Sequence, residues 1–153
     1  MDYTIDSLTH HPMAVDILAE WHHAQWSYLD RDVTLAQRAA ALRRRKSDGI
    51  PLTVVALAGE TVLGSASLIR HDMDTRMELA PWLASVYVAP DYRRQGIGSA
   101  LVRRIEHEAR TLGHRTLYLF TPDMQHFYET LGWKALESTV YRGYAQVVMI
   151  RHL

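Results

Sequence analysis

VYVAPDYRRQGIGS, residues 86–99, is the most informative stretch of this chain of 153 residues. Residues typical of a strand lead into Ala89-Pro90, and helical spacing of apolar residues begins near Ile97. Gly96 and Gly98 lie where that helix starts, and a helix start presents unpaired N–H groups and the positive end of the helix dipole. Because glycine has no side chain, an anion can approach the backbone closely. The stretch therefore predicts a strand, a loop that binds a phosphate or pyrophosphate, and a helix.

This loop alone does not identify a ligand, because a strand–helix turn also uses glycine for its geometry. Two known phosphate-binding loops do not match it. The P-loop requires Gly-Lys followed by Ser or Thr, and residues 86–99 contain no lysine. A dinucleotide fingerprint requires a third Gly or Ala, and this chain has Leu101 at that position.

Strand and helix patterns alternate along the rest of the chain. Strands are expected at Tyr3–Ile5, Leu52–Leu57, Thr61–Ile69, Trp82–Val88, Thr116–Phe120, Trp133–Leu136 and Tyr141–His152. Helices are expected from Pro12, from Thr34 to about Lys46, from Ile97 to Gly113, and from Pro122 (capped by Thr121) to Gly132. The third helix should place Arg103, Arg104, Glu106 and Arg110 away from its apolar stripe. This order predicts one mixed α/β domain over residues 1–153.

The composition is that of an ordinary globular protein, with 48% hydrophobic and 22% charged residues. The 17 basic and 17 acidic residues balance, which weighs against a general nucleic-acid binder. The chain has no cysteine, which excludes disulfides, thiolate zinc sites and a cysteine nucleophile, and fits a reducing compartment. No apolar run reaches the ~18 residues of a membrane span. We therefore expect a cytoplasmic protein with no metal and no nucleic-acid or membrane partner.

The balanced charge hides four blocks of alternating sign. Residues 1–30 carry five acids and no Lys or Arg (−5), and residues 31–46 carry six bases and one acid (+5). Residues 47–92 carry two bases and six acids (−4), and residues 93–153 carry nine bases and five acids (+4). Such blocks fit mixed solvated surfaces, and they equally fit a protein with one acidic and one basic binding surface.

Two motifs together resemble the GCN5-related N-acetyltransferase (GNAT) superfamily. The first is Arg93-x-x-Gly96-x-Gly98 after the strand, and the second is FYETLGW, residues 127–133. The order of expected elements fits the family over essentially the whole chain. The resemblance implies a mixed sheet of six to seven strands flanked by about four helices. It also implies that the two central parallel strands splay into a V.

The resemblance implies acetyl-CoA as co-substrate, with no metal. The strand before the loop would pair with the pantetheine arm, and the loop would hold the pyrophosphate. Many relatives have Asn where this chain has Thr121, so this contact is expected to be weaker or different. The implied cofactor-binding residues are Val86, Tyr87, Val88, Arg93, Arg94, Gln95, Gly96, Ile97, Gly98, Ser99 and Thr121.

By the same resemblance, the reaction is direct acetyl transfer to a primary amine, with Tyr128 as the general acid. Without the family match, Tyr128 reads as a half-buried aromatic residue on a helix. Some relatives carry a catalytic Glu in the strand before the loop, but Trp82–Ala84 contains no acid. Glu78 is the nearest carboxylate, although its position matches poorly. His22, His23 and a chain of ordered waters are the alternatives for the base.

The acceptor is expected near the first helix, where Trp21, His22, Trp26 and Tyr28 accompany several acids. Aromatic and acidic side chains together suit a cationic amine. Alternatively, Trp21 belongs to the core and the acids are solvated. Asp72, Asp74 and Glu78 form a second acidic group that also suits the acceptor side.

Two questions stay open at this point. The fold is also compatible with a module that binds acyl-CoA without turnover, or with an enzyme that uses a longer acyl donor. Dimers are common in the family, and the last strand, Tyr141–His152, is the candidate for pairing across a two-fold axis.

Overall fold

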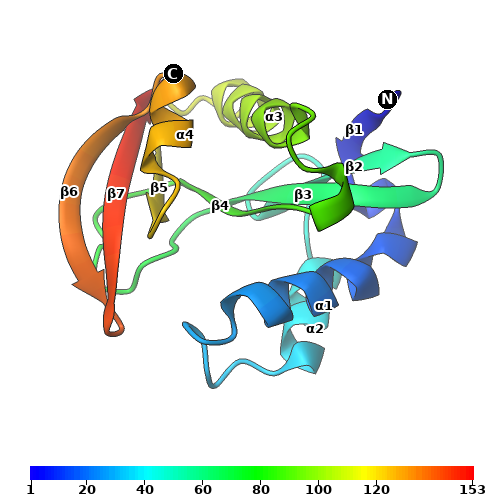
Figure 1. The fold of residues 1–153 in the computed structure, drawn as a ribbon, viewed down its shortest axis with the longest axis horizontal. Coiled ribbons are helices and arrows are strands. Elements are labelled where there is room, and N and C mark those ends of the chain that lie inside the picture. The colour runs from blue at the N-terminus through cyan, green and yellow to red at the C-terminus, as the bar shows by residue number, and fades with distance from the viewer.

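The computed structural model describes residues 1–153, and its seven strands form one sheet in the order β1-β2-β3-β4-β5-β7-β6 (Figure 1). All neighbouring strands are antiparallel except β4 and β5, which are parallel. This confirms the mixed sheet of six to seven strands. The strands are β1 (Thr4–Ser7), β2 (Leu52–Ala58), β3 (Thr61–Ile69), β4 (Trp82–Val88), β5 (Thr116–Thr121), β6 (Lys134–Tyr141) and β7 (Tyr144–His152).

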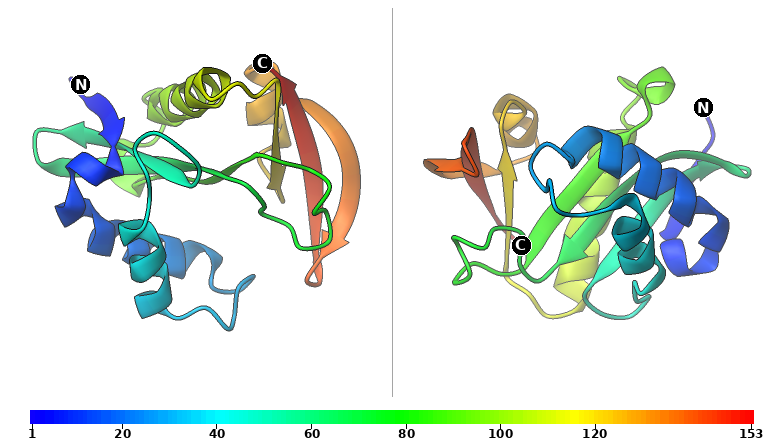
Figure 2. Two further views of the ribbon diagram at one scale, coloured as in Figure 1. Left: turned by 180° about the vertical axis from the view of Figure 1, so that it is seen from behind. Right: turned by 90° about the horizontal axis from the view of Figure 1, so that it is seen from below.

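Four helices cover the sheet, as expected, and they lie on both of its faces (Figure 1, Figure 2). Helix α3 packs on one face, and α1 with α2 packs on the other. None of the helices is both long and apolar enough to traverse a bilayer. The helices are α1 (Val15–Trp26), α2 (Leu35–Arg43), α3 (Ile97–Thr111) and α4 (Gln125–Thr130).

Strand β2 contributes to the hydrophobic cores on both faces of the sheet. Successive side chains of a strand point to opposite faces. Val54 and Ala56 join the core beneath α3, whereas Val55 and Leu57 join the core beneath α1 and α2. A strand that is buried on both faces is almost continuously apolar, and in Leu52–Leu57 the one polar residue, Thr53, shares a hydrogen bond with Ser67.

The parallel strands β4 and β5 meet at only one end. Trp82 is paired with Tyr118, and the Tyr118 N–H donates to the Pro81 carbonyl at 3.1 Å. Beyond this point the two strands form no further pairs, although β5 stays paired with β7 along its whole length. The splayed V implied by the family resemblance is therefore confirmed. A bulge at Ser85, whose φ is 54°, bends β4 within this open part.

Gly64 allows β3 to lie close to the bent part of β4. A methyl group at Gly64 would stand 2.4 Å from the Tyr87 carbonyl oxygen, which is backbone and cannot rotate away. We expect Gly64→Ala to lower the free energy of unfolding by about 2 kcal/mol in urea denaturation, because the core is overpacked there. Gly49→Ala is the control, since its methyl group would meet only the Lys46 side chain, at 3.6 Å. Equal stability of the two variants would contradict this reading.

Several element boundaries were predicted wrongly, including the end of the strand expected at Trp133–Leu136, since β6 runs on to Tyr141. Helix α4 begins at Gln125 rather than Pro122, because Thr121 stays in β5 and its Oγ1 accepts the Met124 N–H at 3.0 Å. Helix α2 ends at Arg43 rather than Lys46, whose N–H donates to the Pro51 carbonyl instead.

The strand predicted over Tyr141–His152 is in fact the turn of a hairpin followed by β7. Arg142 and Gly143, at φ 52° and 87°, make the two-residue turn between β6 and β7. Strand β7 then lies between β5 and β6, so both of its edges are occupied. Strand β7 therefore has no free edge with which to pair across a two-fold axis.

Glu106 was expected on the polar face of its helix, but it is buried, with 1% of its surface exposed. Its carboxylate accepts hydrogen bonds from Arg103 at 3.1 Å and from the Trp133 indole at 3.2 Å. Arg151 lies 3.5 Å away. Glu106 therefore connects α3 to the segment after α4 and to β7.

We expect Glu106→Ala to lower the free energy of unfolding by about 3 kcal/mol, because it leaves buried donors without their partner. The measurement is urea denaturation monitored by tryptophan fluorescence. Glu108→Ala is the control on the same helix, since Glu108 forms only a partly exposed pair with Arg104. That control should lose less than about 1 kcal/mol. A similar loss of unfolding free energy in both variants would show that the burial of Glu106 does not determine its contribution to stability.

Candidate functional site

The loop that opens α3 presents a set of free backbone donors. No group of the protein accepts the N–H groups of residues 94–99, and the first helical bond is made by Ala100 to the Gly96 carbonyl at 3.1 Å. Gly96 has φ 84°, and a side chain there would meet no atom within 4 Å. The loop is open to solvent around Gly96. Free N–H groups at the start of a long helix fit a phosphate or pyrophosphate.

The side chains of this loop have different surroundings. Arg94 and Gln95 are exposed, whereas Ile97 is buried in the core, so Ile97 offers only its N–H group. The Arg93 Nε donates to the Val88 carbonyl at 2.7 Å, and its guanidinium lies 5.4 Å from the centre of the Tyr87 ring. Arg93 therefore fastens the loop to β4.

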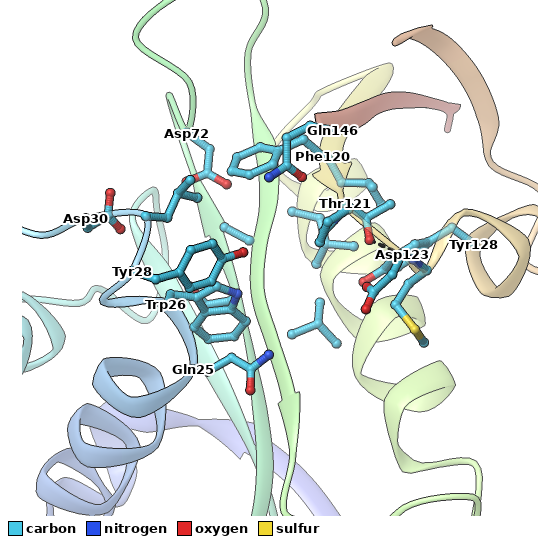
Figure 3. Close-up of a pocket in the computed structure, with 18 of the residues that line it drawn as sticks. Gln25, Trp26, Tyr28, Asp30, Asp72, Phe120, Thr121, Asp123, Tyr128 and Gln146 are labelled. Atoms are coloured by element: carbon cyan, nitrogen blue, oxygen red, sulfur yellow. Dashed lines mark hydrogen bonds between the residues drawn. The ribbon is translucent and has the colours of Figure 1, made fainter. Parts of the chain in front are cut away.

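A cavity of about 270 Å³ lies beside the open part of β4 and β5 (Figure 3). Its wall comes from the end of α1 and the loop after it, α2, the β3–β4 loop, β4, β5 and the loop after it, α4 and β7. The lining residues are Gln25, Trp26, Tyr28, Leu29, Asp30, Arg38, Asp72, Leu83, Ala84, Ser85, Val86, Leu119, Phe120, Thr121, Pro122, Asp123, Met124, Tyr128 and Gln146.

Tyr128 lines this cavity from α4 and is 8% exposed. Its ring packs against Phe127 and Trp133, with ring centres 5.0 Å and 6.1 Å away. Its hydroxyl makes no hydrogen bond within the protein. Burial, assisted by the negative charge of Asp123, raises the pKa of the Tyr128 phenol above its ordinary value. The phenol therefore keeps its proton at neutral pH and is available as a donor.

Asp72 lines the cavity from the β3–β4 loop. Burial raises the pKa of its carboxyl to about 7, the negative charge of Asp30 adds to the shift, and Arg142 opposes it. No residue donates a hydrogen bond to Asp72. From the sequence, Asp72, Asp74 and Glu78 were expected together on the acceptor side. The side chains of Asp74 and Glu78 are exposed and lie outside the cavity lining.

Arg142 holds three loops together near Asp72. One Nη donates to the Leu29 carbonyl and to the Asp30 carboxylate, and the other donates to Asp74 at 3.0 Å. The β6–β7 turn is thereby tied to the loop after α1 and to the β3–β4 loop. Asp30 and Asp74 are both paired with this one arginine, while Asp72 forms no ion pair.

Gln146, on β7, is the most unusual residue of the lining, and sequence reasoning did not single it out. It is 2% exposed, yet neither its amide oxygen nor its amide nitrogen has a hydrogen-bond partner. Leaving a buried polar group unpaired costs about 1–3 kcal/mol. The alternation of β7 was the only available signal, since it places Gln146 on the same face as Val148.

The expected acceptor residues separate into two groups. Trp26 and Tyr28 line the cavity, whereas Trp21 and His22 do not. Trp21 stacks on Tyr87 with ring centres 5.3 Å apart. His22 shares a hydrogen bond with Ser65 at 3.0 Å. Burial, with help from Arg38 and Arg45, lowers the pKa of His22 to about 4, so its imidazole is neutral at pH 7.

The expected cofactor residues also divide by position. Val86 and Thr121 line the cavity, while Tyr87 and Val88 lie farther along β4 toward the loop. Thr121 is buried, and its hydroxyl is occupied by the Met124 N–H.

Comparison with known proteins gives similarity at two levels. Over 52 residues, which are 34% of this chain, the sequence is 42% identical to the amino-acid acetyltransferase of Azotobacter vinelandii and 40% identical to that of Pseudomonas syringae pv. syringae. These matches span only 12% of the length of either relative.

Solved structures match over nearly the whole chain. The ribosomal-protein-alanine N-acetyltransferase of Brucella melitensis has a TM-score of 0.78 at 21% identity, covering 98% of this chain and 99% of that one. The yncA protein of Salmonella typhimurium, solved with its cofactor acetyl-CoA, has a TM-score of 0.77 at 20% identity, and the match covers 100% of this chain and 95% of that one. An aminoglycoside 6'-N-acetyltransferase complexed with coenzyme A has a TM-score of 0.75 at 18% identity, and the match covers 97% of this chain and 96% of that one. At these identities the likeness is one of fold.

The sequence profile of the acetyltransferase (GNAT) family matches residues 14–133, which include both motifs and both strands of the splayed V. That range is most of the chain, and it agrees with the fold shared with the solved acetyltransferases. The chain therefore belongs to the acetyltransferase (GNAT) family.

Proposed function

We propose that this protein transfers an acetyl group from acetyl-CoA directly to a primary amine of a cationic small molecule or peptide. The observation that carries the proposal is the V between β4 and β5, which connects a loop of free N–H groups to a cavity that contains Tyr128. Structures of the same fold hold coenzyme A or acetyl-CoA, which supports the choice of donor.

The donor half of the proposed site consists mainly of backbone groups. The N–H groups of residues 94–99 would hold the pyrophosphate. The edge of β4 at Val86, Tyr87 and Val88, which β5 leaves unpaired, would hold the pantetheine arm, and one N–H group there would polarise the thioester carbonyl. Arg93 is assigned to shaping the loop, because its side chain is engaged by the Val88 carbonyl.

The acceptor half of the proposed site is negatively charged. Three carboxylates line the cavity, from Asp30, Asp72 and Asp123, against a single guanidinium, from Arg38. Trp26 and Tyr28 add aromatic surface that suits a cation. These features support a cationic acceptor and extend the expectation drawn from the acidic blocks of the sequence.

The proposed chemistry needs two proton movements. A free alkyl amine has a pKa of ~10 and must lose a proton before its nitrogen can attack the thioester carbonyl. The new C–N bond then forms, the C–S bond breaks, and the departing thiolate takes a proton from the Tyr128 hydroxyl. The raised pKa of Tyr128 keeps that proton in place until the thiolate forms.

The proposal is tested by incubating the protein with acetyl-CoA and a panel of amines, which includes polyamines, aminoglycosides, amino acids and peptides, and measuring free thiol. We expect thiol release that depends on a cationic amine, together with the acetylated product by mass spectrometry. Binding of acetyl-CoA with no release for any amine would favour the alternative, a non-catalytic acyl-CoA-binding module. Faster release with a longer acyl-CoA would instead change the donor.

A further inference from the structure

We propose that Asp72 and Gln146 form the subsite that binds the acceptor amine, and that this subsite selects an amine with a hydroxyl or carbonyl oxygen on the neighbouring carbon. The inference rests on the proposed function and narrows its acceptor. The two side chains reach the cavity from different elements, the β3–β4 loop and β7, and Figure 3 shows both facing the same space beside Phe120.

The Gln146 amide is built for a partner that the protein itself does not provide. The amide oxygen can accept a hydrogen bond and the amide nitrogen can donate one. Neither has a partner, although only 2% of the residue surface is exposed. An amide that served packing alone would be replaced by an apolar side chain without loss. The unpaired pair of groups therefore indicates a ligand that offers one donor and one acceptor.

The Asp72 carboxylate lacks a neutralising charge. Arg142 is committed to Asp30 and Asp74 on the two sides of its guanidinium. The Arg38 Nε donates to His23 at 3.1 Å, and the Nη atom that lies 3.8 Å from Asp30 has no hydrogen-bond partner. Asp30 raises and Arg142 lowers the pKa of Asp72, and neither is hydrogen-bonded to or ion-paired with it. Asp72 is partly exposed and lines the cavity, so a cation that enters the cavity would pair with its carboxylate.

An ammonium group beside an oxygen atom complements both side chains. Its N–H groups donate to the Asp72 carboxylate and to the Gln146 amide oxygen, and the neighbouring oxygen accepts from the Gln146 amide nitrogen. Asp72 then takes one proton from the ammonium and becomes a carboxylic acid, which leaves the neutral amine that attacks the thioester. The second proton that the nitrogen loses replaces the one given up by Tyr128. The pKa of Asp72, raised to about 7, suits this exchange near neutral pH.

The test uses trans-2-aminocyclohexanol and cyclohexylamine, which differ by one hydroxyl group. Binding is measured by calorimetry with coenzyme A present, so this readout does not depend on turnover. We expect the wild-type protein to bind the amino alcohol at least about 10-fold more tightly, since a site built to hydrogen-bond a hydroxyl discriminates strongly against its absence. Equal binding of the two amines would overturn the subsite.

Gln146→Met is expected to bind both amines equally and to melt at a higher temperature than wild type, because it removes an unpaired buried amide. A glutamine whose amide is hydrogen-bonded within the protein would give the opposite change in melting temperature. Gln146→Leu serves as a second apolar variant if the first is poorly folded. Retention of the preference for the amino alcohol in a folded variant would exclude Gln146 from the subsite.

Asp72→Asn is expected to lower kcat/KM for the amino alcohol at least about 100-fold. In the wild type kcat/KM should rise with pH through about 7, as the Asp72 carboxyl loses its proton, and this rise should be absent in the variant. Glu60→Gln, which changes an exposed carboxylate in the β2–β3 turn outside the cavity lining, should keep both the rise and the preference. An unchanged pH profile in Asp72→Asn would overturn its role. Turnover of neither amine by the wild type, with the binding preference intact, would reject the proposed function and leave the subsite standing.

Discussion

Gly96→Glu is expected to abolish the rise in melting temperature that acetyl-CoA produces in the wild-type protein, and to weaken acetyl-CoA binding at least about 100-fold. The physical reason is that the added carboxylate would stand among the free N–H groups of residues 94–99, where the pyrophosphate is proposed to lie. Two like charges brought together cost several kcal/mol, which exceeds the roughly 3 kcal/mol of a 100-fold loss. Differential scanning fluorimetry with and without acetyl-CoA measures the effect.

The control has to separate charge from backbone strain, because Gly96 has φ 84°. Gly59→Glu is suitable, since Gly59 has φ 61°, also meets no atom within 4 Å, and lies in the β2–β3 turn. It should lose a similar amount of stability and keep full acetyl-CoA binding. Gly96→Ala, which adds strain without charge, should bind acetyl-CoA much better than Gly96→Glu. Normal binding in Gly96→Glu would show that the pyrophosphate does not contact this loop.

Tyr128→Phe is expected to lower kcat about 100-fold and to leave the affinity for acetyl-CoA nearly unchanged. The phenol hydroxyl makes no hydrogen bond within the protein, so its removal takes away the proton donor without breaking a contact. The ring stays packed against Phe127 and Trp133. Steady-state thiol release and calorimetry give the two quantities separately.

The pH dependence sharpens this prediction. Since burial and Asp123 raise the pKa of Tyr128, the wild-type rate should show no loss from ionisation of this phenol up to about pH 10, the ordinary pKa of tyrosine. Tyr118→Phe is the matched control, because Tyr118 lies on β5 outside the cavity lining. If Tyr128→Phe kept the wild-type kcat across the pH range, another group would have to protonate the thiolate.

The part of the fold that could be predicted is the part encoded by neighbouring residues. Strand β4, the loop and α3 follow one another directly, and their glycines and apolar spacing are local signals. The cavity is different, because Asp30, Asp72 and Gln146 come from three distant segments. Their proximity depends on the order of strands in the sheet and on the splaying of β4 from β5. No local pattern in one sequence carries that information.

The errors have the same origin. Glu106 has the helical spacing of a surface residue, and its burial is stabilised by Arg103, Trp133, Arg151 and Arg110. Thr121 and Pro122 have the composition of a helix start, but Thr121 pairs with Val147 across the sheet and so remains in β5. In both cases a tertiary partner overrides a correct local tendency.

The single pairing point between β4 and β5 has a mechanical consequence. The sheet consists of two parts, strands β1 to β4 and strands β5, β7 and β6. Their backbones are hydrogen-bonded to each other only where Trp82 pairs with Tyr118. Elsewhere the two parts of the sheet are held together by side-chain packing of α3, α4 and the loops. An extended molecule lying along the free edge of β4 would fill the gap between the two parts of the sheet and replace the hydrogen bonds that β4 and β5 do not make with each other. Occupancy of the V would then stiffen the whole protein, and the acceptor cavity would acquire its final width only after that molecule is in place.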